Sequence, residues 1–367
     1  MSKSGRQANF ELLRIVAMFM VVVMHYLANT IEPAADGASR ISGPDVVYVV
    51  LESLCIVAVN VYVLISGYFL SETAFSWKRP VRVIAQTLFY TVLIPLILAV
   101  FGALSFSEVF NIYHIWNCIF PVQSGHYWFV TAYVVLMLFT PVLNAAVQKL
   151  EKRQFLQVLA ALLLFFCIGK TISPLQFATD RYGYDFGWFM VLYLIGGYIR
   201  RYGSGFLKNA GRGWAVYLGS AAGIAAVEFL LMFLCQKGVG LVYYRSVPFH
   251  YNFLFCLTGA LGLFSAFLHM EMKEGKAAGM IRFISPAVFG VYLIHEQTDV
   301  AGRWFGWVNG LTGKIGAGFA QQMADGRAVT PVGRYLLLLA LQTLIVFIVC
   351  IVIDKVRGFF VSRIKKL

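Results

Sequence analysis

Residues 9–30 read NFELLRIVAMFMVVVMHYLANT, an apolar run that contains two ionisable side chains deep within it, Arg14 and His25. At 3.6 residues per helical turn, their spacing of eleven residues is close to three whole turns, so both side chains leave the same face, roughly 16 Å apart along the axis. Ionisable groups inside a membrane span are costly and usually face a cavity, a partner or a substrate. We expect Glu11, one turn before Arg14, to pair with it, and Asn29, one turn after His25, to orient the imidazole ring.

The composition predicts a membrane protein. Of the 367 residues, 60% are hydrophobic and only 13% are charged, whereas about a quarter of the residues of a soluble domain are charged. Several apolar runs also reach the roughly 20 residues that a helix needs to cross a bilayer. We therefore expect an all-α, polytopic membrane helix bundle of about ten transmembrane helices, forming a single domain over residues 1–367. Gly196 and Gly197 in the sixth span favour close approach of two helices. The predicted spans cover approximately residues 10–30, 46–70, 82–104, 127–148, 154–172, 186–200, 213–235, 251–270, 281–297 and 332–354.

The distribution of basic residues predicts the orientation of this bundle. A net charge of +13 could indicate nucleic-acid binding, but the Lys and Arg residues form short clusters between apolar runs, which is typical of loops beside anionic lipid. Most of them fall at the two ends of the chain and in the even-numbered loops. Both termini are therefore predicted to be cytoplasmic, and the first apolar run is predicted to be an uncleaved span. Arg14 then lies near the cytoplasmic face and His25 in the outer half of the membrane.

Other polar side chains within or beside the spans are candidates for a functional site, and each also has a structural interpretation. Arg14 could extend its guanidinium to the interface, and His25 could be a hydrogen-bonded structural histidine. Glu228 could be a substrate acceptor, a proton site or half of a buried ion pair, whereas Glu52 could be solvated. The full set of further candidates is Glu52, Asn60, His126, Trp128, Tyr133, Glu228, Tyr292 and His295.

A basic cluster follows the second predicted span. Lys78, Arg79 and Arg82 satisfy the positive-inside bias by themselves, and their position after Ser66 also suits a cytoplasmic ligand that carries phosphate. The sequence contains no Walker loop, HExxH or GxSxG motif, and its six cysteines include no CxxC pair. No metal site and no permanently bound cofactor is therefore expected.

Five motifs follow one another along the chain. The first is a basic residue, ten residues and a histidine, which here reads Arg14-IVAMFMVVVM-His25. The others are VNVYVLISGYFLSE at residues 59–72, WKRPVRV at 77–83, HYWFVTAYVVLMLFTP at 126–141 and SPAVFGVYLIHE at 285–296. In this order the motifs resemble the acyltransferase 3 family of bacterial integral-membrane proteins, which includes surface-polysaccharide O-acetyltransferases. The resemblance covers essentially the whole chain.

The resemblance implies that acetyl-CoA or another acyl-CoA binds from the cytoplasmic side. His25 would then be the catalytic histidine, acting as general base for an acceptor hydroxyl that attacks the thioester. Some members are thought to relay the acyl group on a tyrosine, a role that Tyr133 or Tyr292 would suit. Arg14 would be the motif partner of His25 on the donor side, and the donor-binding residues would be Arg14, Ser66, Lys78, Arg79 and Arg82.

On the acceptor side the chain departs from part of the family. Many relatives that modify polysaccharides carry a fused SGNH hydrolase-like domain, whereas none is expected here. Some relatives place a glutamate after a WSL sequence, whereas Trp128 is followed here by FVTAYV. The acceptor or relay candidates are therefore Glu52, Asn60, His126, Trp128, Tyr133, Glu228, Tyr292 and His295.

Two main functions follow from these observations, and a sensory or scaffold bundle is a further alternative. The first is a membrane O-acyltransferase of the bacterial cytoplasmic membrane, most simply an O-acetyltransferase, that modifies a cell-surface glycan or its lipid-linked precursor. The second is a transporter or exporter of a small solute or amino acid that uses the same buried Arg, His and Glu residues. The expected partners are acyl-CoA, the glycan acceptor and the lipid bilayer, with a homo-oligomer possible and no nucleic acid.

Overall fold

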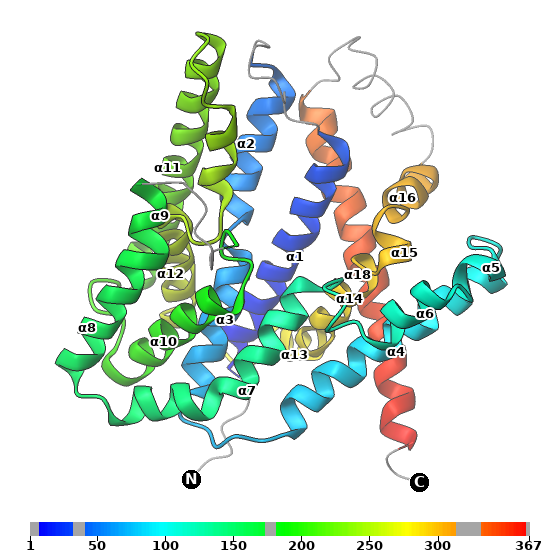
Figure 1. Ribbon diagram of the computed structural model, residues 1–367, viewed down its shortest axis with the longest axis horizontal. Helices are drawn as coiled ribbons and strands as arrows, with labels where there is room; N and C mark the ends of the chain where they lie inside the picture. Colours follow the sequence, from blue (N-terminus) through cyan, green and yellow to red (C-terminus); the bar gives the residue numbers. More distant parts are fainter. Residues whose placement is uncertain (1–6, 32–40, 173–180, 313–331, 365–367) are drawn as a thin grey trace.

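The computed structural model describes residues 7–31, 41–172, 181–312 and 332–364, and within these ranges the chain forms helices and no strands (Figure 1). The helices of the first half are α1 (Ala8–Thr30), α2 (Gly43–Cys55), α3 (Ala58–Leu70), α4 (Lys78–Val100), α5 (Phe106–Val109), α6 (Ile112–Ile119), α7 (Trp128–Lys149), α8 (Lys152–Leu163), η1 (Leu164–Ile168) and α9 (Gly169–Ile172). Those of the second half are α10 (Phe186–Tyr202), α11 (Ala210–Gln236), η2 (Val242–Phe249), α12 (Leu254–Leu268), α13 (Lys276–Ile284), η3 (Ser285–Ala287), α14 (Val288–His295), α15 (Thr298–Ala301), α16 (Trp304–Thr312) and α18 (Val332–Ile364).

Nine segments of the described chain are long and apolar enough to cross a membrane, and they correspond to nine of the ten predicted spans. The exception is the sixth predicted span, residues 186–200, which folds as α10. This helix has 17 residues, about 26 Å of helix, and is shorter than the roughly 30 Å of a typical hydrocarbon core. Its side chains Trp188, Phe189 and Tyr193 are fully buried, so α10 lies inside the bundle.

The second predicted span is one apolar segment but two helices. α2 begins at a capping box, in which the Ser42 side chain accepts from the backbone N–H of Asp45 and the Asp45 carboxylate accepts from the N–H of Ser42. It ends at Cys55, and α3 starts three residues later, after a turn at Ile56 and Val57. The turn interrupts the helix in the middle of the span.

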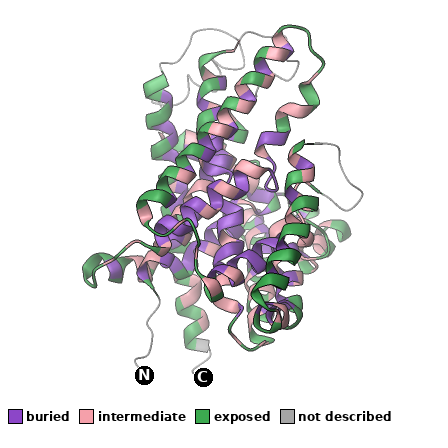
Figure 2. Ribbon diagram, turned by 90° about the vertical axis from the view of Figure 1, so that its left-hand side faces the viewer, coloured by how far each residue is buried: buried purple, intermediate pink, exposed green. Residues whose placement is uncertain are grey.

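Helix α1 lies at the centre of the bundle, where it packs against α2, α3, α12, α13, α14 and α18. Buried residues gather in the middle of the molecule, and exposed ones line the outer surfaces of the peripheral helices (Figure 2). Many of the exposed side chains are large and apolar, such as Leu337, Ile348 and Phe360 on α18. An apolar outer surface of this kind suits contact with lipid rather than water.

The glycines of the sixth predicted span bring helices together, as expected. A Cβ on Gly196 would lie 2.5 Å from the carbonyl oxygen of Leu64, and one on Gly67 would lie 2.2 Å from that of Tyr193. α10 and α3 therefore meet backbone to backbone, which only glycine permits at these two positions.

Helix α1 begins and α18 ends at the same end of the bundle (Figure 1). This arrangement agrees with two termini on one side of the membrane. That this side is the cytoplasm stays a prediction from the basic residues.

Candidate active site

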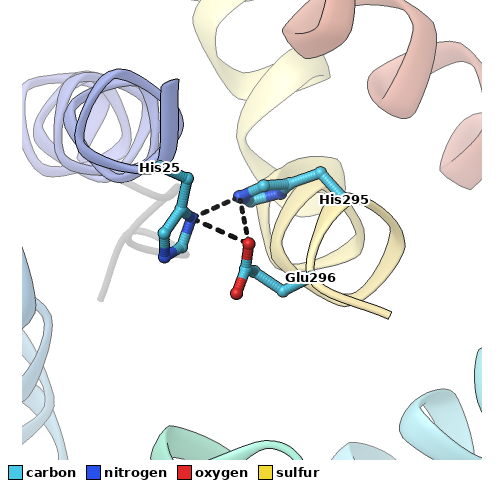
Figure 3. Close-up of side chains that lie close together, drawn as sticks. All are labelled: His25, His295 and Glu296. Atoms are coloured by element: carbon cyan, nitrogen blue, oxygen red, sulfur yellow. Dashed lines mark hydrogen bonds and ion pairs between the residues drawn. The ribbon is translucent and has the colours of Figure 1, made fainter. Parts of the chain in front are cut away.

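Three side chains from opposite ends of the sequence meet at one point in the bundle (Figure 3). His25 comes from the last turns of α1, His295 is the last residue of α14, and Glu296 is the residue that ends that helix. The Nδ1 atom of His25 lies 2.9 Å from Nε2 of His295 and 3.2 Å from Oε1 of Glu296. That carboxylate oxygen is 3.9 Å from Nε2 of His295.

The hydrogen bonds assign the protons of the two imidazoles. Nδ1 of His295 lies 2.6 Å from the carbonyl oxygen of Val291, and a carbonyl oxygen can only accept, so this nitrogen carries the proton. In a neutral His295, Nε2 is then an acceptor, and Nδ1 of His25 donates to it. A neutral His25 consequently has an unprotonated Nε2, and Figure 3 shows this nitrogen facing away from His295.

His25 also lines a cavity of about 310 Å³ that extends along α1. The walls are mostly apolar, with a few polar groups at intervals, which is the usual character of a small-molecule site. Polar or aromatic residues on the walls are Glu11, Arg14, His25, Tyr62, Ser66, Trp128, Phe129, Tyr133, Tyr251, Ser285, Phe289 and Tyr292. One cavity therefore joins the two ionisable residues of the first helix, although they lie about three turns apart.

Arg14 is paired rather than free. Its guanidinium donates to the carboxylate of Glu11, as expected from the spacing, and this carboxylate also accepts from the hydroxyl of Ser285. Glu11 is buried, whereas Arg14 is partly exposed. Because the pair is nearly neutral overall, Arg14 offers hydrogen-bond donors to the cavity more than an excess charge.

The remaining donor-side candidates fall into two groups. Ser66 lines the cavity, where its hydroxyl donates to the carbonyl oxygen of Tyr62 and lies 2.9 Å from the hydroxyl of Tyr133. Lys78, Arg79 and Arg82 lie at the start of α4 and are not among the residues of the cavity wall. Lys78 and Arg82 are exposed, so this cluster is available at the surface.

The acceptor or relay candidates are distributed over three cavities. Tyr133, Tyr292 and Trp128 line the cavity of His25. Trp128 also lines a second cavity of about 860 Å³, together with Glu52. His126 lines a third, of about 620 Å³, and its ring contacts the hydroxyl of Thr298.

Two candidates lie outside these three cavities and have partners of their own. Asn60 is fully buried, its amide nitrogen donates to the carbonyl oxygen of Tyr251 at 2.7 Å, and its amide oxygen accepts from Nε1 of Trp188 at 3.0 Å. Glu228 forms a buried ion pair with Arg245 at 3.0 Å. Both residues hold helices together and neither lines the cavity of His25.

The expectation for Asn29 is wrong, because its amide donates to the backbone carbonyl of His25 at 2.7 Å and not to the ring. The ring is oriented by His295 and Glu296 instead. Glu296 was not among the candidates from sequence, and the only local signal for it is its position directly after His295. Burial raises the pKa of Glu296 to about 7 and lowers the pKa of His126.

Comparison with protein-family models shows to which family the chain belongs. A family model described as an acyltransferase domain matches residues 7–355. Comparisons with curated proteins and with solved structures find no match. The matched region begins at the first helix, contains His25, His295 and Glu296, and ends within α18. The chain therefore belongs to the acyltransferase 3 family and is a multi-pass membrane acyltransferase.

Proposed function

We propose that the protein transfers an acyl group, most simply acetyl, from acyl-CoA to a hydroxyl group of a cell-surface glycan or its lipid-linked precursor. The observation that carries this proposal is the imidazole of His25. Its Nδ1 is held by His295 and Glu296 at 2.9 and 3.2 Å, and its ring lines a cavity. A histidine with one nitrogen fixed by an acidic partner and the other free is the arrangement of a general base.

In the proposed reaction, Nε2 of His25 takes the proton of the acceptor hydroxyl while the oxygen attacks the carbonyl carbon of the thioester. The tetrahedral intermediate collapses with cleavage of the carbon–sulfur bond. The departing thiolate receives the proton back from Nε2, so that the products are the acyl ester and free coenzyme A. Glu296 lies close enough to stabilise the imidazolium that forms between these steps.

The donor is proposed to enter the cavity from the Arg14 end. The cavity runs along α1, is largely apolar and contains hydrogen-bonding groups at intervals, which suits an extended pantetheine arm with its amides. Lys78, Arg79 and Arg82 would bind the phosphates of coenzyme A outside the cavity. Such an arm accounts for the roughly three helical turns between Arg14 and His25 without placing both at the reacting atoms.

The acceptor is proposed to occupy the second cavity. This cavity shares Trp128 with the first and offers the aromatic side chains of Tyr48, Tyr184 and Phe249 beside the carboxyl of Glu52. Glu52 is buried, and its carboxyl makes no hydrogen bond or ion pair with the part of the chain that the structure describes. A sugar ring can stack on aromatic faces and donate hydroxyls to such a carboxyl.

The orientation predicted from the basic residues completes the proposal. With the termini in the cytoplasm of a bacterium, the Arg14 end of the cavity faces the acyl-CoA pool and the second cavity faces the outer side of the cytoplasmic membrane. The transporter alternative has no comparable support, since a solute pathway does not need a histidine whose second nitrogen is held by a buried His and a carboxylate.

The test is acetyl transfer by the purified protein in lipid nanodiscs. We expect release of free coenzyme A from acetyl-CoA, stimulated by a glycan acceptor, and loss of this activity in His25→Ala. The matched control is Asn29→Ala, one turn away on the same helix, which loses only a bond to a backbone carbonyl. Unchanged release in His25→Ala would remove His25 from catalysis, whereas solute counterflow in liposomes without any acyl donor would favour the transporter.

A further inference from the structure

We infer that His25, His295 and Glu296 also form a binding site for a divalent transition-metal cation, for which Zn²⁺ is the best fit. Binding of the metal does not depend on the proposed function. Its inhibitory effect on acyl transfer, described below, does rest on the proposed function.

The spacing of the ligand atoms fits zinc. Nitrogen and oxygen atoms about 2.0–2.1 Å from a tetrahedral zinc ion lie about 3.3–3.4 Å from one another. The three separations here are 2.9, 3.2 and 3.9 Å, and they bracket that value. Each residue contributes one donor atom, and the three atoms lie within 4.8 Å of one another. A cation can therefore be accommodated with shifts of a few tenths of an ångström in the side chains.

The hydrogen bond behind His295 prepares it as a ligand. Its Nδ1 donates to the carbonyl oxygen of Val291 at 2.6 Å, so Nε2 presents a lone pair to the cluster. Metal-binding histidines usually make this kind of bond through their second nitrogen, because the bond fixes the tautomer and the ring orientation. His295 is buried and cannot turn toward solvent.

The ligand types and their accessibility also point to zinc. Two imidazole nitrogens and one carboxylate suit zinc, whereas magnesium and calcium prefer oxygen ligands only. The side chains of His25 and Glu296 are 30% and 26% exposed, which leaves a route for the ion. Three protein ligands leave the fourth position of a tetrahedral ion for water. The ion pairs formed by Glu296 within the described ranges are those with the two histidines, so no Lys or Arg neutralises its charge there.

Zinc at this position would disable the base. In the metal-free site the proton of His25 is on Nδ1 and the lone pair on Nε2 accepts the substrate proton. A cation on Nδ1 takes the lone pair of that nitrogen, so the proton of the neutral imidazole must move to Nε2. Zinc binding and base catalysis by His25 therefore exclude each other. Zinc inhibits the reaction because it holds His25 in the tautomer that has no free lone pair on Nε2.

The experiment measures binding first. Metal-free protein in nanodiscs is titrated with Zn²⁺ by calorimetry and with Co²⁺ by absorption spectroscopy. We expect one equivalent of each metal and the intense visible bands of tetrahedral cobalt. His295→Ala and Glu296→Gln should each weaken binding by more than roughly 10- to 100-fold, which is the loss seen when a residue hydrogen-bonded to a metal ligand is removed. Glu296→Gln keeps the shape of a partly exposed residue. It therefore tests the metal site even if His295→Ala does not fold.

The matched control is His114→Ala. His114 forms another His–carboxylate pair, with Asp299 at 3.0 Å, but lies outside the three-ligand group. Equal zinc affinity in wild type, His295→Ala and Glu296→Gln would overturn the inference, as would octahedral cobalt spectra alone. If the wild-type protein binds zinc but transfers no acyl group, the metal site is supported and the proposed function is refuted. Transfer that persists in millimolar zinc, without binding, would refute the metal site alone.

Discussion

Nδ1 of His25 lies 2.9 Å from Nε2 of His295, although the two residues are 270 positions apart in the chain. The contact joins α1 and α14, two helices of the matched acyltransferase domain. It also decides which nitrogen of His25 is free, so His295 is a positioning residue in the proposed reaction.

Replacing His295 by Ala should lower kcat for acetyl transfer by roughly 100- to 10,000-fold, the range that a general base contributes. The KM for acetyl-CoA should change little, because His295 does not line the donor cavity. Steady-state release of coenzyme A gives both constants, with His114→Ala as the control. A rise in KM at constant kcat would show that His295 acts on donor binding instead.

Neutralising the basic cluster at the start of α4 should weaken donor binding. In a Lys78→Gln, Arg79→Gln and Arg82→Gln variant, the KM for acetyl-CoA should rise about tenfold or more, equivalent to one lost charge-assisted hydrogen bond. Turnover of an acetyl thioester that lacks the nucleotide phosphates should be unaffected. Lys152→Gln with Arg153→Gln, from another basic cluster, is the control. If the triple variant loses as much activity with the phosphate-free thioester as with acetyl-CoA, the cluster does not bind the phosphates.

Glu52→Gln should impair acyl transfer to the glycan acceptor without impairing cleavage of the acyl-CoA donor. The substitution replaces the carboxyl by an amide but keeps the shape of a side chain on the acceptor cavity. We expect a higher KM for the glycan acceptor and unchanged release of coenzyme A in its absence. Both rates are measured on the same preparation. If both fall together, Glu52 supports the fold or the donor site.

Tyr133 and Tyr292 should be dispensable as acyl carriers if transfer is direct. Tyr133→Phe and Tyr292→Phe keep both rings in the donor cavity and remove only the hydroxyls. Each variant should retain activity within a few-fold, and rapid mixing with radiolabelled acetyl-CoA should leave no label on the protein. A stable acetyl-tyrosine, or a complete loss of activity in one variant, would establish a relay.

Gly196→Ala should destabilise the bundle by about 1–3 kcal/mol, the usual cost of overpacking. The new Cβ would meet backbone atoms of α3 at 2.5 and 2.8 Å, which cannot move aside as a side chain can. Gly219→Ala is the control, because its Cβ would meet nothing within 4 Å. Thermal unfolding in detergent should show a lower Tm for the first variant and an unchanged or slightly higher one for the second.

The sequence predicted the helical fold well because the relevant signal is local. Apolar length alone located nine spans, and the spacing of Glu11 and Arg14 predicted their pair. The sequence did not show that residues 186–200 form a short helix inside the bundle, or that α2 and α3 divide one span. Those features depend on contacts with other helices.

The site was predicted only in part for the same reason. His25 and Arg14 stand out because ionisable groups are rare in apolar runs. Glu296 lies at the end of a helix, where a carboxylate is ordinary, and only the fold brings it within 3.2 Å of His25. Asn60 and Glu228 were also candidates, but the sequence could not show that their partners would be Trp188 and Arg245.

Trp128 lines both the first and the second cavity, and this position has a consequence for the membrane voltage. Trp128 stacks on Tyr251, with ring centroids 5.6 Å apart. In the proposed orientation, the two cavities open toward opposite sides of a membrane that supports a voltage. One elementary charge that crosses it dissipates about 2.3 kcal/mol per 100 mV. Trp128, which lines both cavities, and the Tyr251 ring stacked on it would therefore also limit a leak of protons between the two sides.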